Sequence, residues 1–246
     1  MIKYFDAHIH LNSPKLQELL ETNEFSEWIF NNISTNIEDF RIALEQTKKY
    51  SNVYLTAGIH PLEINDLDAT EVIEEFKREI ENYKKCIAIG EIGLDFYRYS
   101  KEEVFEKQKE WFLLQCKLAK ELNLPVILHI RNAHEEALEI LNTLDNYGII
   151  HCFEGTLELA NKYLALKNNW MLSISPLAFR EGSNLREVVK SVDISKLLVE
   201  TDAPYLCKNN ETIKDIISLI AEEKGISFEE CRSTLLNNFY SFFKWH

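Results

Sequence analysis

Short apolar runs rich in β-branched residues alternate with helical stretches along all 246 residues of the chain. We count about eight such units, and strands that are apolar on both faces are typical of a parallel sheet covered by helices. Eight strand–helix units close a (β/α)8 barrel. The sequence therefore predicts an α/β protein with a (β/α)8 TIM-barrel fold. The expected strands are residues 3–9, 28–33, 53–59, 86–91, 125–130, 148–152, 170–174 and 197–200.

A single domain over residues 1–246 is the expected organisation. No internal repeat, low-complexity tract or Gly/Ser-rich linker interrupts the alternation, so the sequence indicates no boundary. The clearest expected helix covers residues 101–122 and stops before Pro125. Two more helices are expected over residues 211–246, with aromatic side chains that pack against the barrel. These aromatic residues are Phe239, Tyr240, Phe242, Phe243 and Trp245.

Composition limits the class of protein and its partners. No run is apolar enough to span a bilayer, and the amino terminus carries no signal sequence, so we expect a cytoplasmic protein without membrane contacts. A monomer is the default oligomeric state. Five cysteines without a closely spaced pair predict reduced thiols, and Cys152 is expected to pack in the core rather than act as a nucleophile. The formal net charge of −13 argues against tight, nonspecific DNA binding, although bound cations can reverse the field of a site.

Several potential metal ligands lie at or just past the ends of the apolar runs. They are His8, His10, Glu91, His129, His151 and Asp202. The carboxyl ends of parallel strands meet at one edge of a sheet, so side chains from distant parts of the sequence can converge there on an ion cluster. A lone histidine after a strand is usually structural, but this many coincidences make separate structural explanations improbable. The set predicts a metal-dependent hydrolase.

Other residues near these ligands could take part in the site or be purely structural. Asp6 has the strand parity of the first two histidines, and it could hydrogen-bond to a ligand or be purely structural. Glu200 competes with Asp202 as a ligand, but its parity places it deeper on the same face. Gly90 and Gly93 would let the backbone bend closely around a site.

Several motifs occur in a fixed order and cover nearly the whole chain. They read FDAHIH at 5–10, GIHP at 58–61, AIGEIGLD at 88–95, HIR at 129–131, IHCF at 150–153 and ETDAPYL at 200–206. This ordered set resembles the TatD family of metal-dependent deoxyribonucleases, within the amidohydrolase-like group of TIM barrels.

The resemblance implies that the six ligands named above bind two divalent ions. His8, His10 and Asp202 would hold the first ion, and His129 and His151 would hold the second. Glu91 would bridge the two ions. His60 would contact substrate or a bound phosphate at the rim, unless it is an ordinary turn histidine. Arg131 would clamp a phosphate, with a plain salt bridge as the alternative.

The expected mechanism uses two ions about 3.5–4 Å apart to lower the pKa of a water, which Asp202 orients or deprotonates, so that hydroxide is the nucleophile. Histidine and carboxylate ligands suit Zn²⁺, Mn²⁺ or Co²⁺ better than Mg²⁺, although Mg²⁺ stays open. Two carboxylates against four neutral imidazoles leave the filled site with surplus positive charge, which favours a phosphodiester such as DNA. Four basic residues just beyond strand ends could add local positive charge: Arg98, Arg131, Arg180 and Lys208.

The chain departs from the usual family pattern at Ile130, Asn132 and Glu154, and in a shortened segment after Leu206. The ligand set is intact, so a small amide, lactone or phosphoester is the alternative substrate of the same kind of site. A noncatalytic scaffolding relative is a further alternative, which failure to bind two metals would favour.

Overall fold

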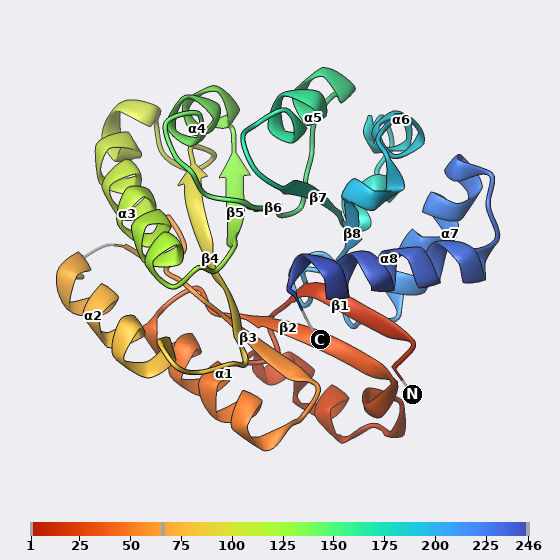
Figure 1. Ribbon diagram of the computed structural model, residues 1–246, viewed down its shortest axis with the longest axis horizontal. Coiled ribbons are helices and arrows are strands. Elements are labelled where there is room, and N and C mark those ends of the chain that lie inside the picture. Colours follow the sequence, from red (N-terminus) through yellow and green to blue (C-terminus); the bar gives the residue numbers. More distant parts are fainter. Residues whose placement is uncertain (1, 65–66, 245–246) are drawn as a thin grey trace. The chain divides into compact units, whose positions relative to one another are not determined.

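The structure is a computed structural model that describes residues 2–64 and 67–244, so the packing expected of Trp245 falls outside the described residues. The strands form one sheet in the order of the sequence, and the neighbouring pairs with a recorded register run parallel. This order and the helices between the strands are those of a (β/α)8 barrel, which confirms the predicted fold class (Figure 1). The strands are β1 (Tyr4–Ile9), β2 (Trp28–Ile33), β3 (Val53–Ala57), β4 (Cys86–Asp95), β5 (Val126–Arg131), β6 (Gly148–Ile150), β7 (Trp170–Ile174) and β8 (Leu197–Val199).

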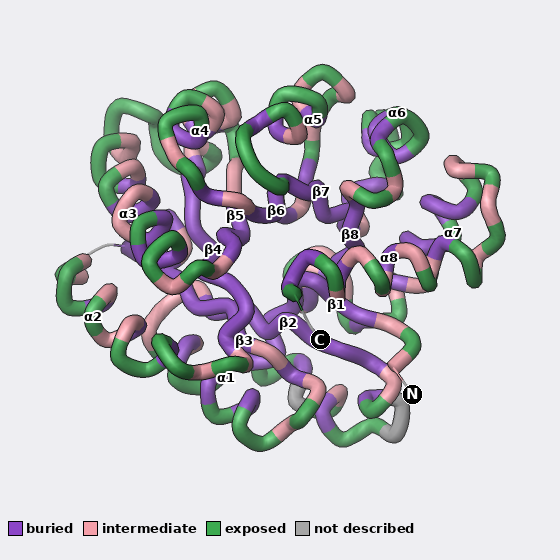
Figure 2. The backbone as a smooth tube through the Cα atoms, viewed as in Figure 1, coloured by how far each residue is buried: buried purple, intermediate pink, exposed green. Residues whose placement is uncertain are grey.

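Helices follow the strands. The α-helices are α1 (Ile37–Lys49), α2 (Ala69–Ile80), α3 (Lys101–Glu121), α4 (His134–Leu141), α5 (Leu157–Leu164), α6 (Leu185–Ser191), α7 (Thr212–Lys224) and α8 (Phe228–Phe242). Short 3₁₀ helices cover Pro14–Glu21, Asn23–Glu27, Pro176–Phe179 and Ile194–Lys196. Within the described residues, no helix has the length and apolar character that crossing a membrane requires. Figure 2 shows buried strands and helices with exposed outer turns.

The chain divides into two compact units. The first unit comprises Met1–Asn32, His151–Ala165 and Trp170–His246. The second comprises Ile33–Ile150 and Leu166–Asn169. The single domain expected over residues 1–246 stays a prediction.

In the first unit, β2 forms in spite of two buried asparagines. The Asn31 amide donates to the carbonyl oxygen of Ala7 at 3.0 Å, and Oδ1 of Asn32 accepts from the backbone N–H of Leu11 at 2.9 Å. Both side chains therefore satisfy backbone groups in and just after β1, which removes most of the cost of burying an amide. These bonds explain why a strand with two adjacent asparagines can be fully buried.

The aromatic residues of α8 pack on β1. The rings of Phe5 and Phe239 lie 4.6 Å apart between centroids, and the ring of Phe243 lies 4.8 Å from that of Phe239. Phe5 and Phe239 are fully buried. The predicted packing role of this aromatic cluster is confirmed for these carboxyl-terminal phenylalanines.

In the second unit, α3 fixes the segments that follow β3 and end β4. The side-chain amide of Gln115 accepts from the N–H of Ile59 at 2.8 Å and donates to the carbonyl of Ile59 at 3.1 Å. Gln108 forms the same pair of bonds with the backbone of Asp95, at 2.9 and 3.1 Å. Both glutamines are buried and lie two helical turns apart on one face of α3. The helix thereby positions the residues around His60 and the end of β4.

Three predicted strand ends were wrong by two or more residues, and those of β5 and β8 by one residue. β3 ends at Ala57 rather than residue 59, because the backbone of Ile59 bonds to Gln115. β6 ends at Ile150 rather than residue 152, because Cys152 has a left-handed backbone with φ of 43°. β4 continues to Asp95 rather than stopping at residue 91, because it stays paired with β5 up to Arg131.

Gly93 makes the extended pairing of β4 possible. It lies opposite His129 with φ of 141°, and an added Cβ would lie 2.1 Å from the carbonyl oxygen of His129. No L-side chain fits there without moving β4 away from β5. The glycine was expected to let the backbone bend around a site, and the structure shows that it permits close strand approach beside His129.

The exchange Gly93→Ala is expected to lower the free energy of unfolding by about 2–3 kcal/mol, because the methyl group collides with backbone rather than with a flexible side chain. Gly182→Ala is the matched control. Gly182 also has positive φ, of 76°, but no atom lies within 4 Å of its added Cβ, so only the left-handed cost of about 1 kcal/mol applies. Urea denaturation measures both, and equal losses would contradict the steric explanation.

Candidate metal centre

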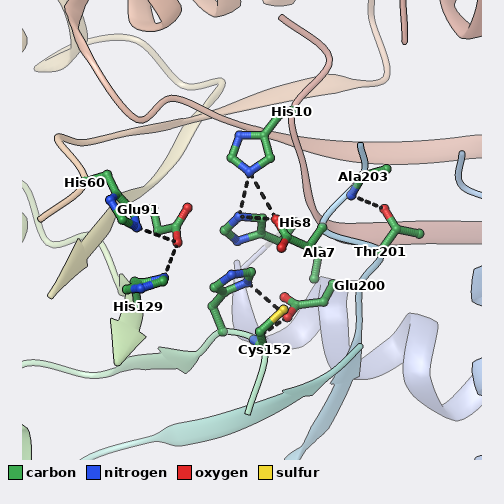
Figure 3. Close-up of polar contacts among 12 residues, drawn as sticks. Ala7, His8, His10, His60, Glu91, His129, Cys152, Glu200, Thr201 and Ala203 are labelled. Carbon is green, nitrogen blue, oxygen red and sulfur yellow. Dashed lines mark hydrogen bonds and ion pairs between the residues drawn. The ribbon is translucent and has the colours of Figure 1, made fainter. Parts of the chain in front are cut away.

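Three potential ligand atoms form a tight triangle in the first unit. Nε2 of His8 lies 3.2 Å from Nε2 of His10, and Oδ1 of Asp202 lies 3.2 Å from the latter and 3.7 Å from the former. Backbone bonds hold the two chain segments together: the N–H of Asp202 donates to the His8 carbonyl, and the N–H of His10 donates to the Ala203 carbonyl, both at 2.9 Å. Figure 3 shows the rings of His8 and His10 converging.

This triangle fits a divalent ion. Ligands about 2.1 Å from a tetrahedral zinc lie about 3.4 Å from one another, and the three measured separations bracket that value. Two imidazoles and a carboxylate are also a suitable donor set for Zn²⁺ or Mn²⁺. Asp202 holds its place with a left-handed backbone, φ of 51°, which is uncommon for a residue other than glycine and is concentrated at functional sites.

Asp6 supports this triangle through the backbone. Its carboxylate accepts from the backbone N–H of Thr201 at 3.0 Å, from the Thr201 hydroxyl at 2.5 Å and from the N–H of His8 at 3.2 Å. Burial raises the pKa of Asp6 to about 7. Of the two readings of Asp6, the structure shows the structural one: the carboxylate joins β1 to the segment after β8, and its recorded bonds go to no ligand ring.

His151 carries a carboxylate on one ring nitrogen. Nδ1 of His151 lies 3.0 Å from Oε1 of Glu200, and the His151 ring stacks on the His8 ring with centroids 3.5 Å apart. Burial opposes ionisation of Glu200, but its interactions with neighbouring groups, chiefly His151 and then His8, together outweigh burial and lower the pKa of Glu200 to about 2. A carboxylate in this place fixes the ring and directs Nε2 toward an ion. Glu200 therefore orients a candidate ligand, whereas Asp202 lies in the triangle.

Cys152 does not have the strand geometry predicted for it. Its backbone is left-handed, and its N–H donates to Oε1 of Glu200. Burial raises the pKa of the thiol well above its ordinary range, so the thiolate needed for nucleophilic attack is scarce at neutral pH. The expectation that Cys152 is no nucleophile agrees with this environment.

In the second unit, His129 lies between two carboxylates. Nδ1 of His129 is 2.8 Å from Oε1 of Glu91, and Nε2 is 2.9 Å from Oδ2 of Asp95. The other oxygen of Asp95 accepts from the backbone N–H of Tyr97 at 2.8 Å. Burial raises the pKa of Asp95, but its bonds from His129 and Tyr97 prevail, so the pKa is lowered and the carboxylate is ionised at neutral pH.

Asp95 was not among the predicted site residues. The fourth strand was predicted to stop at Glu91, and the parity that would have placed Asp95 on the same face extends only as far as the strand does. The recorded β4 includes both residues. The sequence signal was the continued apolar alternation through Leu94.

His60 reaches into the same group. Nδ1 of His60 accepts from the N–H of Leu62 at 3.1 Å, so the neutral ring carries its proton on Nε2. Nε2 lies 3.6 Å from Oε1 of Glu91, and the His60 ring lies 4.3 Å from that of His129 (Figure 3). The turn bond and the contact with the ligand group are both present, and the imidazole can donate into the group.

The basic residues after the strands differ in their surroundings. Arg131 is exposed, and its guanidinium lies 3.6 Å from the ring centroid of Tyr97. No ion pair of Arg131 is recorded among residues 2–64 and 67–244, so the salt-bridge alternative is not what the structure shows. Arg180 lies 3.8 Å from Glu154 and is partly neutralised by it.

A family model described as TatD related DNase matches residues 5–244. The uncharacterized metal-dependent hydrolase YabD of Bacillus subtilis is 35% identical, over 95% of this chain and 96% of its own. The 3'-5' ssDNA/RNA exonuclease TatD of Shigella flexneri is 36% identical, over 73% of this chain and 69% of its own. The crystal structure of YJJV, a TatD homologue from Escherichia coli, superposes with a TM-score of 0.88 at 26% identity and covers 99% of both chains.

The barrel, its ligand groups and these relatives define a metal-dependent hydrolase that acts on ester bonds. Within that class, the chain belongs to the TatD-related DNase family.

Proposed function

We propose that the protein hydrolyses phosphodiester bonds of DNA with two divalent ions. The observation that carries the proposal is the triangle of His8, His10 and Asp202, whose separations suit one ion. Its ligands lie at or beyond the carboxyl ends of barrel strands, which is where enzymes of this fold place their active sites.

We assign the second ion to His129 and His151, with Glu91 as a carboxylate shared by both ions. The order of these ligands along the chain matches the family pattern. Each histidine has a carboxylate on one ring nitrogen, Asp95 for His129 and Glu200 for His151. Such carboxylate–histidine pairs are characteristic of metal ligands and raise their basicity. Two ions, as Zn²⁺, Mn²⁺ or Mg²⁺, are the proposed cofactors.

The ions, when bound, supply a Lewis acid for the phosphate and lower the pKa of the attacking water toward neutrality. Asp202 is the residue proposed to accept that water's proton: its side chain is 14% exposed, whereas those of His8 and His10 are 0% and 3% exposed. Its carboxylate can therefore meet the substrate from the open side. The Nε2 proton of His60 and the guanidinium of Arg131 provide donors for phosphate oxygens.

Digestion of single-stranded DNA labelled at either end tests the proposal. The protein is stripped of metal and assayed with and without Mg²⁺, Mn²⁺ or Zn²⁺, with Glu91→Gln as the inactive control. Metal-dependent cleavage that the substitution abolishes supports a deoxyribonuclease, and the label pattern gives the polarity. A protein that holds two ions but cleaves no DNA would direct the search to small amides, lactones and phosphoesters. The monomeric state and the cytoplasmic location stay predictions.

Asp95→Asn is expected to weaken metal binding about 10- to 100-fold. The Asp95 carboxylate raises the basicity of the His129 imidazole, and a neutral amide cannot do this. Hydrolysis should recover when the metal concentration is raised, since the ligand itself remains. Asp145→Asn is the control from the same unit: Asp145 forms exposed ion pairs with Lys120 and Lys167, which contribute little. Titration with metal measures both, and an unchanged affinity in Asp95→Asn would contradict the orienting role.

A further inference from the structure

Exposed aromatic side chains are concentrated after the carboxyl ends of strands. Among the described residues, the large hydrophobic side chains that are exposed are Ile42, Tyr97, Tyr99, Phe179 and Tyr205. All except Ile42 are aromatic, and they follow β4, β7 or β8. Barrel enzymes bind their substrates at this end of the strands, so rings exposed there are available to a ligand.

Tyr97 and Arg131 form a defined pair within the second unit. The guanidinium lies over the Tyr97 ring at 3.6 Å from its centroid, and the ring is 59% exposed. The pair is also tied to the ligand group. Asp95 accepts from the N–H of Tyr97 with one oxygen and bonds His129 with the other.

The spacing along β5 places the pair next to a candidate metal ligand. His129 and Arg131 are two residues apart in β5, so their side chains leave the same face of the strand, about 7 Å apart along it. That is roughly the distance between neighbouring phosphates in an extended nucleic acid strand. The pair therefore lies about one nucleotide from the residue proposed to bind the second ion.

We propose that Tyr97 and Arg131 form a nucleotide-binding platform, in which the tyrosine ring stacks on an unpaired nucleobase and the guanidinium binds the adjoining phosphate. A guanidinium stacked on a ring keeps its N–H edge outward for a bidentate phosphate contact. The aromatic ring accepts any base, because every base has a π face, which suits a single strand without sequence preference. This inference rests on the proposed phosphodiesterase function and specifies how the substrate is held.

The local chemistry of the pair favours a nucleotide over an acidic peptide. A carboxylate would engage the guanidinium alone, whereas a nucleotide uses both members at once. A base within a duplex is stacked on its neighbours and cannot reach the ring, so unpaired nucleotides are the expected ligand.

Binding of fluorescent oligothymidylate, followed by anisotropy, tests the platform. All proteins carry Glu91→Gln so that the oligonucleotide is not cut, and an oligonucleotide of equal length with abasic residues serves as the base-free probe. Tyr97→Ala is expected to raise the Kd for oligothymidylate about tenfold and to leave the Kd for the abasic probe unchanged. Arg131→Gln is expected to weaken the binding of both probes, because both contain the phosphate.

Two controls separate stacking from local damage. Tyr97→Phe keeps the ring and should bind oligothymidylate as the parent does. Tyr99→Ala removes a neighbouring ring that is 51% exposed and that contacts no arginine among the described residues, and it should also leave the Kd unchanged. A Tyr97→Ala protein that binds both probes like the parent, or loses both equally, would overturn the platform.

Failure of the platform and failure of the proposed nuclease activity give different results. Binding is measured without hydrolysis, so base-dependent binding through Tyr97 in a protein that cleaves no DNA would reject the nuclease proposal alone. Metal-dependent cleavage of DNA with a KM that Tyr97→Ala leaves unchanged would reject the platform alone.

Discussion

Exchange of Asp202 for Asn is expected to lower kcat at least about 10³-fold, with little change in the free energy of unfolding. The amide has the size of the carboxylate but cannot accept a proton, and it is a weaker ligand than the charged oxygen 3.2 Å from His10. Asn is also among the few residues that tolerate the left-handed backbone at this position, φ of 51°. The substitution therefore removes the chemistry with minimal strain.

Turnover of labelled DNA, metal content and thermal unfolding are the three measurements that check this. Asp215→Asn is the matched control, since Asp215 is an exposed carboxylate on α7 in the same unit. It should behave as the parent in all three. An Asp202→Asn protein that binds metal and keeps more than about a tenth of the parent's kcat would show that another group accepts the proton.

The convergence of candidate ligands could be predicted from sequence because strand parity and strand ends are local properties. His8 and His10 share a face by the two-residue period of β1, and the structure brings their nitrogens within 3.2 Å. The triangle is completed by Asp202, which backbone bonds between the ends of β1 and β8 hold in place. Barrel topology supplies that contact once the strand order is known.

The supporting carboxylates could not be predicted in the same way. The role of Asp95 depends on how far β4 pairs with β5, which is decided by the close approach at Gly93 and not by the apolar pattern. The close contact of His151 with Glu200 depends on the left-handed turn at Cys152 that ends β6. Both are tertiary features. The two-residue alternation of a strand does not show in the sequence where β4 or β6 ends.

The contact of Arg131 with Tyr97 is another tertiary feature that the sequence could not predict. The two residues lie 34 positions apart, on loops and strand ends whose relation depends on the register of Asp95 opposite Arg131. From sequence, a phosphate clamp and an ordinary salt bridge were both open for Arg131. The phosphate clamp stays a prediction, and the contact that the structure shows for the Arg131 guanidinium is the one with the Tyr97 ring.

Removal of metal is expected to abolish hydrolysis and to lower the thermal stability of the protein. Ions that bind only the folded chain stabilise it by about 2.7 kcal/mol each when present at a hundred times their Kd. The candidate ligands are drawn from distant strands, so the unfolded chain offers no comparable site. Re-addition of metal should restore both activity and stability, and thermal unfolding with and without chelator measures the difference.

Single substitutions of the histidine ligands should each remove one of the two ions. The intact protein is expected to hold two ions, His8→Ala to lose the ion of the triangle, and His129→Ala to lose the other. His134→Ala is the control, because His134 begins α4 and lies in none of the groups of possible ligands that the described residues form. Elemental analysis after dialysis counts the ions. One ion in the intact protein, lost equally in both ligand variants, would mean that the histidines serve a single site and that the two-ion mechanism is wrong.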